Sequence, residues 1–174
     1  MSETQTGVRL ALAETGTANV TTGLPLLDHL VAELVRTARF KLSLEVAPGS
    51  ADAAAGAAGA ALGAALRERL ATEGAAGSGW ALVPADEALA SAALERSERP
   101  RLVTNVDFSG QSVGGVSTDV ASRFLRELAA SAQLNLHVRL VEGTDPQHVL
   151  AAIFKAVGAA LGQACRPVPH AKED

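Results

Sequence analysis

Few residues of this chain could hold a metal ion or act as a nucleophile, since it contains four histidines and one cysteine. Asp28 and His29 stand together in TTGLPLLDHLVAEL, at the start of an apolar helical pattern. His137 lies in an alternating apolar segment, and His148 lies in the first turn of the last predicted helix. Imidazole is a common ligand of divalent metals, so these positions suggest a metal site. Taken singly, each histidine also fits an ordinary position at the end of a helix or strand.

The composition excludes several other classes of function. A net charge of −4 without a run of Lys or Arg argues against a general nucleic-acid binder, which needs clustered cations to neutralise phosphates. Cys165 has no partner for an internal disulfide, as in a protein of the reducing cytoplasm. The polar N-terminus does not resemble a signal peptide, and the Ala-rich stretch 51–66, interrupted by glycines, predicts a globular-protein helix rather than a membrane span. We expect a cytoplasmic protein without a nucleic-acid or membrane partner.

The elements that carry these histidines occur twice along the chain. FKLSLEVAPGSADAAAGAAGAALGAAL (40–66) is similar to LNLHVRLVEGTDPQHVLAAIFKAVGAAL (134–161): each has an alternating strand, a glycine and a long helix that ends Gly-Ala-Ala-Leu. Upstream, LLDHLVAELVRTA matches VASRFLRELAASA, with apolar residues at helical spacing in both. VRLAL and ANVTT precede the first of these helices, and RLVTNVDF and QSVGGVS precede the second, so we predict two strands ahead of each.

The predicted architecture is therefore an α+β fold made of an internally duplicated β-β-α-β-α unit, with two sheets and helices packed between or against them. We expect one domain over residues 1–174, with repeats at about 3–72 and 79–165. The Gly-rich stretch 71–80 is the predicted linker between them. The following WALVPADEALASAALERS is ambiguous, because its propensities favour a helix while a strand is also possible.

Five segments in order, TGLPLLDHL, VPADEALA, LERSERP, NLHV and GTDPQHVLAAIFKA, resemble the imidazoleglycerol-phosphate dehydratase family of histidine biosynthesis. The likeness covers about residues 3–165, and Glu3-Thr4 falls in register with the family's opening Glu-Thr. It implies the duplicated fold that the repeat predicts independently. It also implies a carbon–oxygen lyase with two manganese ions, which stabilise charge while water leaves the glycerol chain of the substrate.

The resemblance carries over only part of the manganese ligand set. His29, His137 and His148 match three of the family's ligands. The remaining ligand positions, in two His-His-x-x-Glu clusters of the family, align with Asp52, Ala53, Gly56, Gln147 and Ala151. Asp52 can bind a metal through oxygen and Gln147 weakly, whereas Ala and Gly have no donor. The resemblance therefore implies a dimanganese site that is largely lost, with no cofactor, or at most one metal ion held by His29, His137, His148 and Asp52.

Only some of the positions that bind the substrate phosphate in the family keep a matching residue in this chain. Arg99 matches the arginine of the Ser-Gly-Arg motif, and Lys155 matches the lysine of Phe-Lys-Ala. Lys172 is the one residue of the family's C-terminal phosphate loop that stays in register. Glu33 and Glu98 replace a glutamine and a glycine, and their negative charges repel a phosphate. A small phosphorylated ligand is thus compatible with this chain but not dictated by it.

The Asp-Glu-Ala motif keeps Asp86 and Glu87, with Glu87 as the candidate acid–base; the same pair also fits an ordinary helix start.

Three functions stay open. In the first, the chain is a dehydratase homologue that is inactive or very weak and has a scaffold or regulatory role. In the second, it is an active lyase with a reduced metal site, which acts on imidazoleglycerol phosphate or another small phosphate ester. In the third, it is a binding module for a phosphorylated metabolite. The resemblance also implies a homo-oligomer. We expect the family's trimer, whose contacts need no metal, and not its 24-subunit shell.

Overall fold

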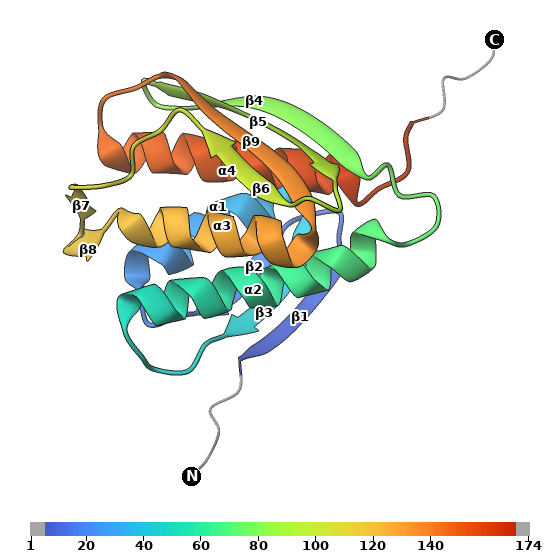
Figure 1. Ribbon diagram of the computed structural model, residues 1–174, viewed down its shortest axis with the longest axis horizontal. Helices are drawn as coiled ribbons and strands as arrows, with labels where there is room; N and C mark the ends of the chain where they lie inside the picture. Colours follow the sequence, from blue (N-terminus) through green and yellow to red (C-terminus); the bar gives the residue numbers. More distant parts are fainter. Residues whose placement is uncertain (1–5, 170–174) are drawn as a thin grey trace.

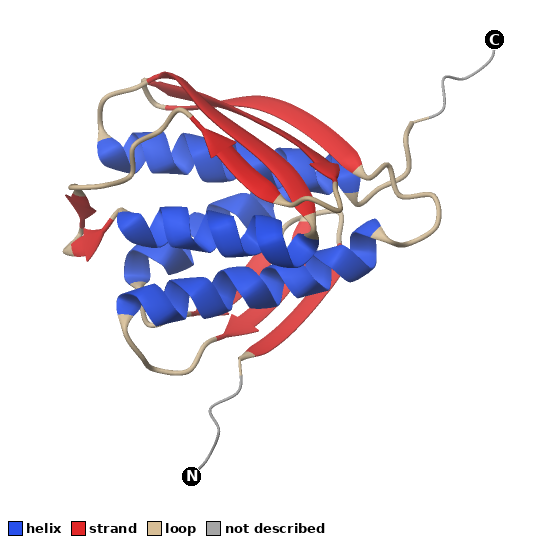
Figure 2. Ribbon diagram, in the orientation of Figure 1, coloured by secondary structure: helices blue, strands red, loops and turns tan. Residues whose placement is uncertain are grey.

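A computed structural model describes residues 6–169 and shows a layer of four helices between two sheets (Figures 1 and 2). The first sheet has the order β1-β3-β2, and the second has the order β4-β5-β9-β6. The strands of the first sheet are β1 (Gly7–Leu12), β2 (Thr17–Thr21) and β3 (Phe40–Glu45). Those of the second sheet are β4 (Ser78–Ala85), β5 (Ala88–Arg96), β6 (Arg101–Thr104) and β9 (Leu134–Glu142).

The helices pair across the two halves of the chain. They are α1 (Pro25–Ala38), α2 (Ala51–Leu70), α3 (Asp119–Ala132) and α4 (Pro146–Ala164). α1 of the first half packs on α4 of the second, and α2 of the first half packs on α3 of the second. A short hairpin, β7 (Ser112–Val113) and β8 (Val116–Ser117), precedes α3. Because each helix pair combines both halves, the two repeats share one hydrophobic core.

Glycine lets the paired helices approach to backbone contact. A Cβ atom on Gly63 of α2 would lie 2.8 Å from the carbonyl oxygen of Leu128 on α3. A Cβ atom on Gly158 of α4 would overlap the carbonyl oxygen of Leu34 on α1. Helix interiors disfavour glycine by about 1 kcal/mol relative to alanine, so its presence here is explained by the close packing. The Ala- and Gly-rich composition of α2 thus encodes a packing surface.

Hydrogen bonds repeat the duplication in detail. The hydroxyl of Thr37 on α1 donates to the carbonyl of Lys155 on α4 at 2.7 Å. At the matching place, the hydroxyl of Ser131 on α3 donates to the carbonyl of Ala60 on α2 at 2.8 Å. Both α1 and α3 end in a left-handed residue. In each sheet the strand after the first helix has one antiparallel and one parallel neighbour. The predicted duplicated β-β-α-β-α unit is therefore confirmed.

The structure resolves the ambiguous segment and corrects two predictions. The segment after the linker, for which a helix and a strand both stayed open, forms the β4–β5 hairpin, with a tight turn at Asp86 and Glu87. Small residues alternate along β5, and burial of every second one against α4 outweighs the helix propensity of alanine. The strand that matches β1 is consequently β5, whereas RLVTNVDF contributes β6 and QSVGGVS forms only the β7–β8 hairpin. The predicted linker 71–80 also ends early, because β4 begins at Ser78.

No helix within residues 6–169 combines the length and the apolar character that a membrane crossing requires.

Candidate functional site

A hydrogen-bonded pair, Glu87 and His148, lies where the β4–β5 turn meets the start of α4. Oε2 of Glu87 is 2.6 Å from Nδ1 of His148, and Oδ2 of Asp86 is 3.3 Å from Nε2 of the same ring. The other carboxylate oxygen of Glu87 accepts the backbone N–H of Asp145 at 3.1 Å. Asp145 in turn caps α4 by accepting the backbone N–H of Gln147 at 2.9 Å. The turn and the helix start hold each other in place through this network.

The charges of this pair reinforce each other. The hydrogen bond to Glu87 raises the pKa of His148, and the nearby charges of Glu87, Asp145 and Asp86 act in the same direction against partial desolvation. The pKa of Glu87 is lowered, chiefly by a hydrogen bond from its own backbone and also by His148 and the Asp145 backbone. Both shifts favour the charged form of the group that they affect. Both ring nitrogens of His148 face carboxylates, so the ring can exchange protons with them.

His29 lies exposed on α1, which packs against α4. α1 and α4 run in the same direction, since Gly158 meets Leu34 and Gly162 meets Ala38. Nζ of Lys155 on α4 lies 3.9 Å from Oε2 of Glu33 on α1. One turn earlier, Ala151 is on the same face of α4 as Lys155, and His29 is on the same face of α1 as Glu33. The position that the family resemblance assigns to a glutamate ligand is therefore a methyl group beside His29.

Asp28 serves the local backbone rather than its neighbour His29. Its Oδ1 accepts the backbone N–H of Thr22 at 2.9 Å and the hydroxyl of the same residue at 2.5 Å. Leu24 follows Thr22 and precedes α1 without a side-chain cap of its own. These bonds fix the turn that enters α1, which explains an aspartate here without any metal.

In the first half, an arginine lies beside the α2 residues that the family resemblance matches with metal ligands. Arg123 on α3 is the repeat counterpart of His29, and its Nη1 lies 3.8 Å from Oδ2 of Asp52. A Cβ atom on Gly56 would lie 2.8 Å from Nε of Arg123, so the guanidinium covers that glycine. Glu127, one turn along α3, lies 3.3 Å from Nη2 of Arg123. The guanidinium therefore places a positive charge at these α2 positions.

The other predicted residues lie apart from Glu87 and His148. His137 is exposed on the outer face of the second sheet, opposite its buried neighbours Leu136 and Val138. Arg99 is exposed in the turn after β5, whereas Glu87 precedes the first residue of that strand. The length of β5 separates the two ends by about 26 Å. A single chain thus does not bring Arg99 to the Glu87–His148 pair.

Within residues 6–169, no three or more His, Cys, Asp or Glu side chains are grouped so that they could hold a metal ion. The structure accordingly does not gather His29, His137, His148 and Asp52 in one chain. Lys155 is half-buried and forms an ion pair with Glu33, and Lys172 lies outside the described residues.

Two residues that shape these surroundings were not predicted from the sequence. Arg123 carried no recognisable motif, while Asp145 before Pro146 is a helix-start signal that could have been identified.

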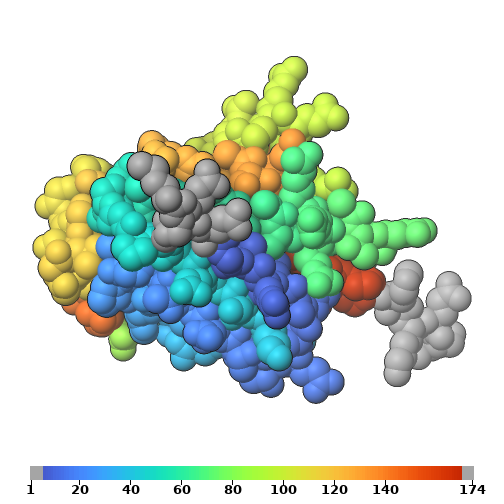
Figure 3. Space-filling model, turned by 90° about the horizontal axis from the view of Figure 1, so that it is seen from below, coloured from blue at the N-terminus to red at the C-terminus, as the bar shows by residue number. Residues whose placement is uncertain are grey.

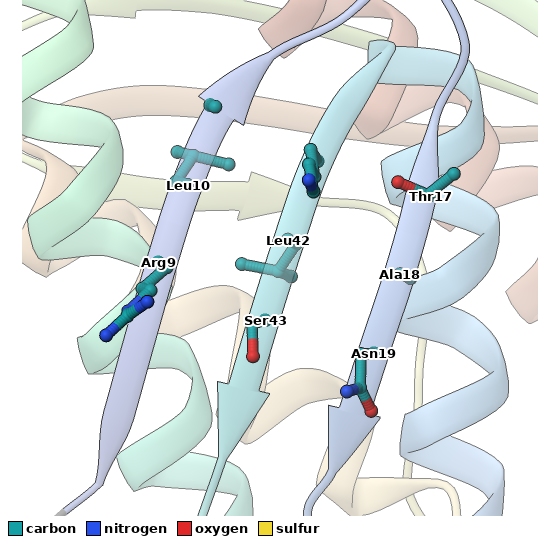
Figure 4. A pocket seen from close by; sticks show the side chains of 9 residues that line it. Arg9, Leu10, Thr17, Ala18, Asn19, Leu42 and Ser43 are labelled. Atoms are coloured by element: carbon teal, nitrogen blue, oxygen red, sulfur yellow. The ribbon is translucent and has the colours of Figure 1, made fainter.

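A cavity in the first half of the molecule does not coincide with these residues. It occupies about 520 Å³ on the outer face of the first sheet and is lined by polar side chains that include Arg9, Asn19, Lys41 and Ser43 (Figure 4). A second hollow, of about 380 Å³, is lined by Asp52 and Arg123 together with residues of the loop before α3. His137 lines a smaller hollow of about 200 Å³. The cavities therefore do not single out one preformed site in the isolated chain.

Known proteins resemble this chain along nearly its whole length. The family model described as imidazoleglycerol-phosphate dehydratase matches residues 22–161. The imidazoleglycerol-phosphate dehydratase of Desulforudis audaxviator is 37% identical over 169 residues, which cover 94% of this chain and 86% of the relative. The protein of the same name from Bacillus subtilis is 35% identical over 176 residues, covering 98% of this chain and 90% of the relative.

Solved structures agree with the sequence comparison. The crystal structure of imidazoleglycerol-phosphate dehydratase from Staphylococcus aureus superimposes with a TM-score of 0.85 at 27% identity, covering 94% of this chain and 95% of the other. The Pyrococcus furiosus structure, at 22% identity and a TM-score of 0.81, supports the likeness in fold alone. The resemblance read from the five sequence segments is confirmed. By sequence and by fold, this chain belongs to the imidazoleglycerol-phosphate dehydratase family.

Proposed function

We propose that this chain is an imidazoleglycerol-phosphate dehydratase homologue whose dimanganese site is largely lost. It is inactive or very weak as a dehydratase and has a scaffold or regulatory role. The observation that carries the proposal is the position of Arg123, whose guanidinium covers Gly56 and pairs with Asp52. Both α2 residues align with metal ligands of the family. A positive charge beside them opposes the binding of a metal cation.

The donor set of this chain supports the same proposal. Ala53, Gly56 and Ala151 have no side-chain donor, and the neutral amide of Gln147 is a weaker ligand than a carboxylate. Two manganese ions do not fit these residues. At most one ion fits, with its ligands drawn from the set His29, His137, His148 and Asp52 of neighbouring chains.

The Glu87–His148 pair favours a second candidate function, an active lyase on imidazoleglycerol phosphate or another small phosphate ester with a reduced metal site. A carboxylate that is hydrogen-bonded to an accessible imidazole can transfer protons. In this alternative Glu87 is the acid–base, with a weaker contribution from Asp86. The phosphate is bound by Arg99, Lys155 and Lys172. The dehydratase names of the relatives also favour it.

Metal content and turnover distinguish the two candidates. The chain is purified without added metal and dialysed, its metals are counted by mass spectrometry, and turnover of imidazoleglycerol phosphate is measured with and without manganese. The Bacillus subtilis relative serves as the positive control. We expect less than about one thousandth of the control's rate. A stoichiometric metal with a comparable rate, abolished by Glu87→Gln, establishes the second candidate instead.

A pure binding module for a phosphorylated metabolite is the remaining alternative. Calorimetry with imidazoleglycerol phosphate tests it, because a saturable heat without turnover is expected only of such a module. Absence of heat at about 1 mM ligand contradicts it.

The proposal includes a homo-oligomer, with a trimer expected and the 24-subunit shell not expected, in the cytoplasm. Large apolar side chains gather on the outer face of the second sheet, where Trp80 is 63% exposed and Leu82 is 48% exposed. Val103 and Val141, also exposed, come from β6 and β9 of the same sheet. Trp80 and Leu82 lie two residues apart on the same face of β4, and an exposed apolar pair of this kind supports an interface there. Light scattering of the wild type and of Trp80→Ser tests it: a trimer that the substitution weakens supports the proposal, and a monomeric wild type contradicts it.

A further inference from the structure

Polar side chains cross the outer face of the first sheet in two rows. In one row, Arg9 of β1 is paired with Ser43 of β3, and Ser43 is paired with Asn19 of β2. In the next row, Lys41 of β3 is paired with Thr17 of β2. Side chains alternate along a strand, and the residues that come between these on β1 and β3 pack on the core, so both rows point away from the helices. Figure 4 shows these side chains, and Figure 3, seen from below, shows the blue β1 and β2 segments at the surface.

The two cations of these rows stand close enough to hold one ligand. Arg9 and Lys41 are diagonal neighbours on β1 and β3, a relation that places Cβ atoms about 7–8 Å apart. Both side chains are long and flexible, so the guanidinium and the ammonium can converge on a group that lies over Ser43. Ala11, which is paired with Lys41, leaves room beside it. The hollow over these residues has a volume of about 520 Å³, which is in the range of small-molecule sites.

The positive charges of this face have no internal counterion in the described part of the chain. Within residues 6–169, neither Arg9 nor Lys41 takes part in an ion pair. Glu45 lies on the same face in the row beyond Ser43, where it is paired with Gly7, and it forms no ion pair with Arg9. Like charges on neighbouring strands repel each other, and an anion bound between them removes this repulsion.

The duplication shows that the fold does not require these polar residues. Ser43 matches His137 of β9, whose partners in the corresponding row are Ala93 of β5 and Val103 of β6. The guanidinium and the amide that flank Ser43 are thus replaced by apolar side chains in the second sheet. The two rows are therefore a property of the first sheet's surface and not a consequence of how the repeated unit packs.

We propose that this hollow binds a small metabolite through a phosphate monoester group. Such a group carries close to two negative charges, which match the two cations, and three terminal oxygens, which accept hydrogen bonds from the guanidinium fork and from the hydroxyl and amide donors of the rows. A carboxylate has a single charge and two oxygens, so it uses fewer of these donors. The site lies on the first sheet, whereas Arg99, which the family resemblance assigns to the phosphate, follows β5 of the second sheet.

Calorimetry on the full chain at low ionic strength tests the proposal. The probes are glycerol 3-phosphate and inorganic phosphate, and glycerol is the uncharged control. We expect saturable binding of glycerol 3-phosphate with a dissociation constant of about 0.1–1 mM, binding of inorganic phosphate that is no tighter, and no binding of glycerol. Binding of inorganic phosphate alone, or no saturable binding of the ester up to about 10 mM, overturns the proposal.

Variants on the two sheets locate the binding. Arg9→Gln and Lys41→Gln should each weaken binding of glycerol 3-phosphate about tenfold, because each removes one charge-assisted hydrogen bond. Lys41→Arg keeps the charge and should bind within severalfold of the wild type. Arg139→Gln is the matched control, since Arg139 is also exposed on an outer sheet face and is paired with a serine, Ser91, but lies on the second sheet. Equal weakening by Arg9→Gln and Arg139→Gln contradicts the proposal.

Two further measurements identify other origins of a binding signal. If Arg99→Gln weakens binding while Arg9→Gln does not, the phosphate binds at the family's position and the proposal is wrong. Light scattering shows whether the two cations instead contact a second copy of the chain. Dissociation of an oligomer by Arg9→Gln, without phosphate binding to the wild type, also contradicts the proposal. Metal content and turnover do not enter these measurements, so this proposal and the proposed function can fail separately.

Discussion

The guanidinium of Arg123 lies over Gly56, so that a Cβ atom added there would stand 2.8 Å from its Nε. Asp52, one turn earlier on α2, lies 3.8 Å from the same side chain. The family resemblance matches both α2 positions with a metal-binding cluster. Under the proposed function, the replacement of two ligands and the cation of Arg123 occur at one place on α2.

The Glu87–His148 pair predicts a pH dependence of stability. The pKa of His148 is raised, so its contribution is fully present below the ordinary value of 6.5 and is lost as pH rises through the folded value. The pKa of Glu87 is lowered, so its contribution is present above 4.5 and is lost as pH falls through the folded value. Both are fully present between these limits. The melting temperature of His148→Gln should fall below that of the wild type at about pH 5.5 and approach it at about pH 9. An NMR pKa of His148 at or below the ordinary histidine value contradicts this prediction.

Gly158→Ala should destabilise the fold, since the added methyl group overlaps the Leu34 carbonyl and the Thr37 hydroxyl. Overpacking of this kind costs about 1–3 kcal/mol in the free energy of unfolding. Gly56→Ala is the matched control, because its methyl group meets only the far end of the Arg123 side chain and no backbone atom, and gains helix propensity of about 1 kcal/mol. Urea denaturation measures both. Equal effects of the two substitutions are incompatible with close packing of α1 on α4.

Arg166 should contribute strongly to stability, because its guanidinium joins the ends of both helices of one pair. It donates to the carbonyls of Ala38 and Gly162 at 2.8 and 2.9 Å. It also donates to Arg39 and Ala13 at 2.7 and 3.1 Å. Arg166→Ala should lower the free energy of unfolding by about 2–4 kcal/mol. Arg166→Lys should recover only part of it, since one ammonium cannot reach four carbonyls. Full recovery by lysine in urea denaturation would show that charge alone matters.

The repeat made the fold largely predictable, because the helix–strand–helix segment of each half has a matching partner in the other half of the sequence. The β4–β5 hairpin was not predictable from propensity, since alanine favours helices and only burial against α4 selects the strand. Glu87 and His148 meet because β5 pairs with β9, which spacing alone does not reveal. The role of Arg123 required the helix packing itself, as only the contact with Gly56 places its charge.

Crystals of the protein soaked in manganese and measured at the manganese absorption edge test the central claim most directly. The account predicts at most one anomalous peak per chain and no pair of peaks beside Asp52, Gly56, Gln147 and Ala151. Two full-occupancy manganese ions seated next to these residues would contradict it.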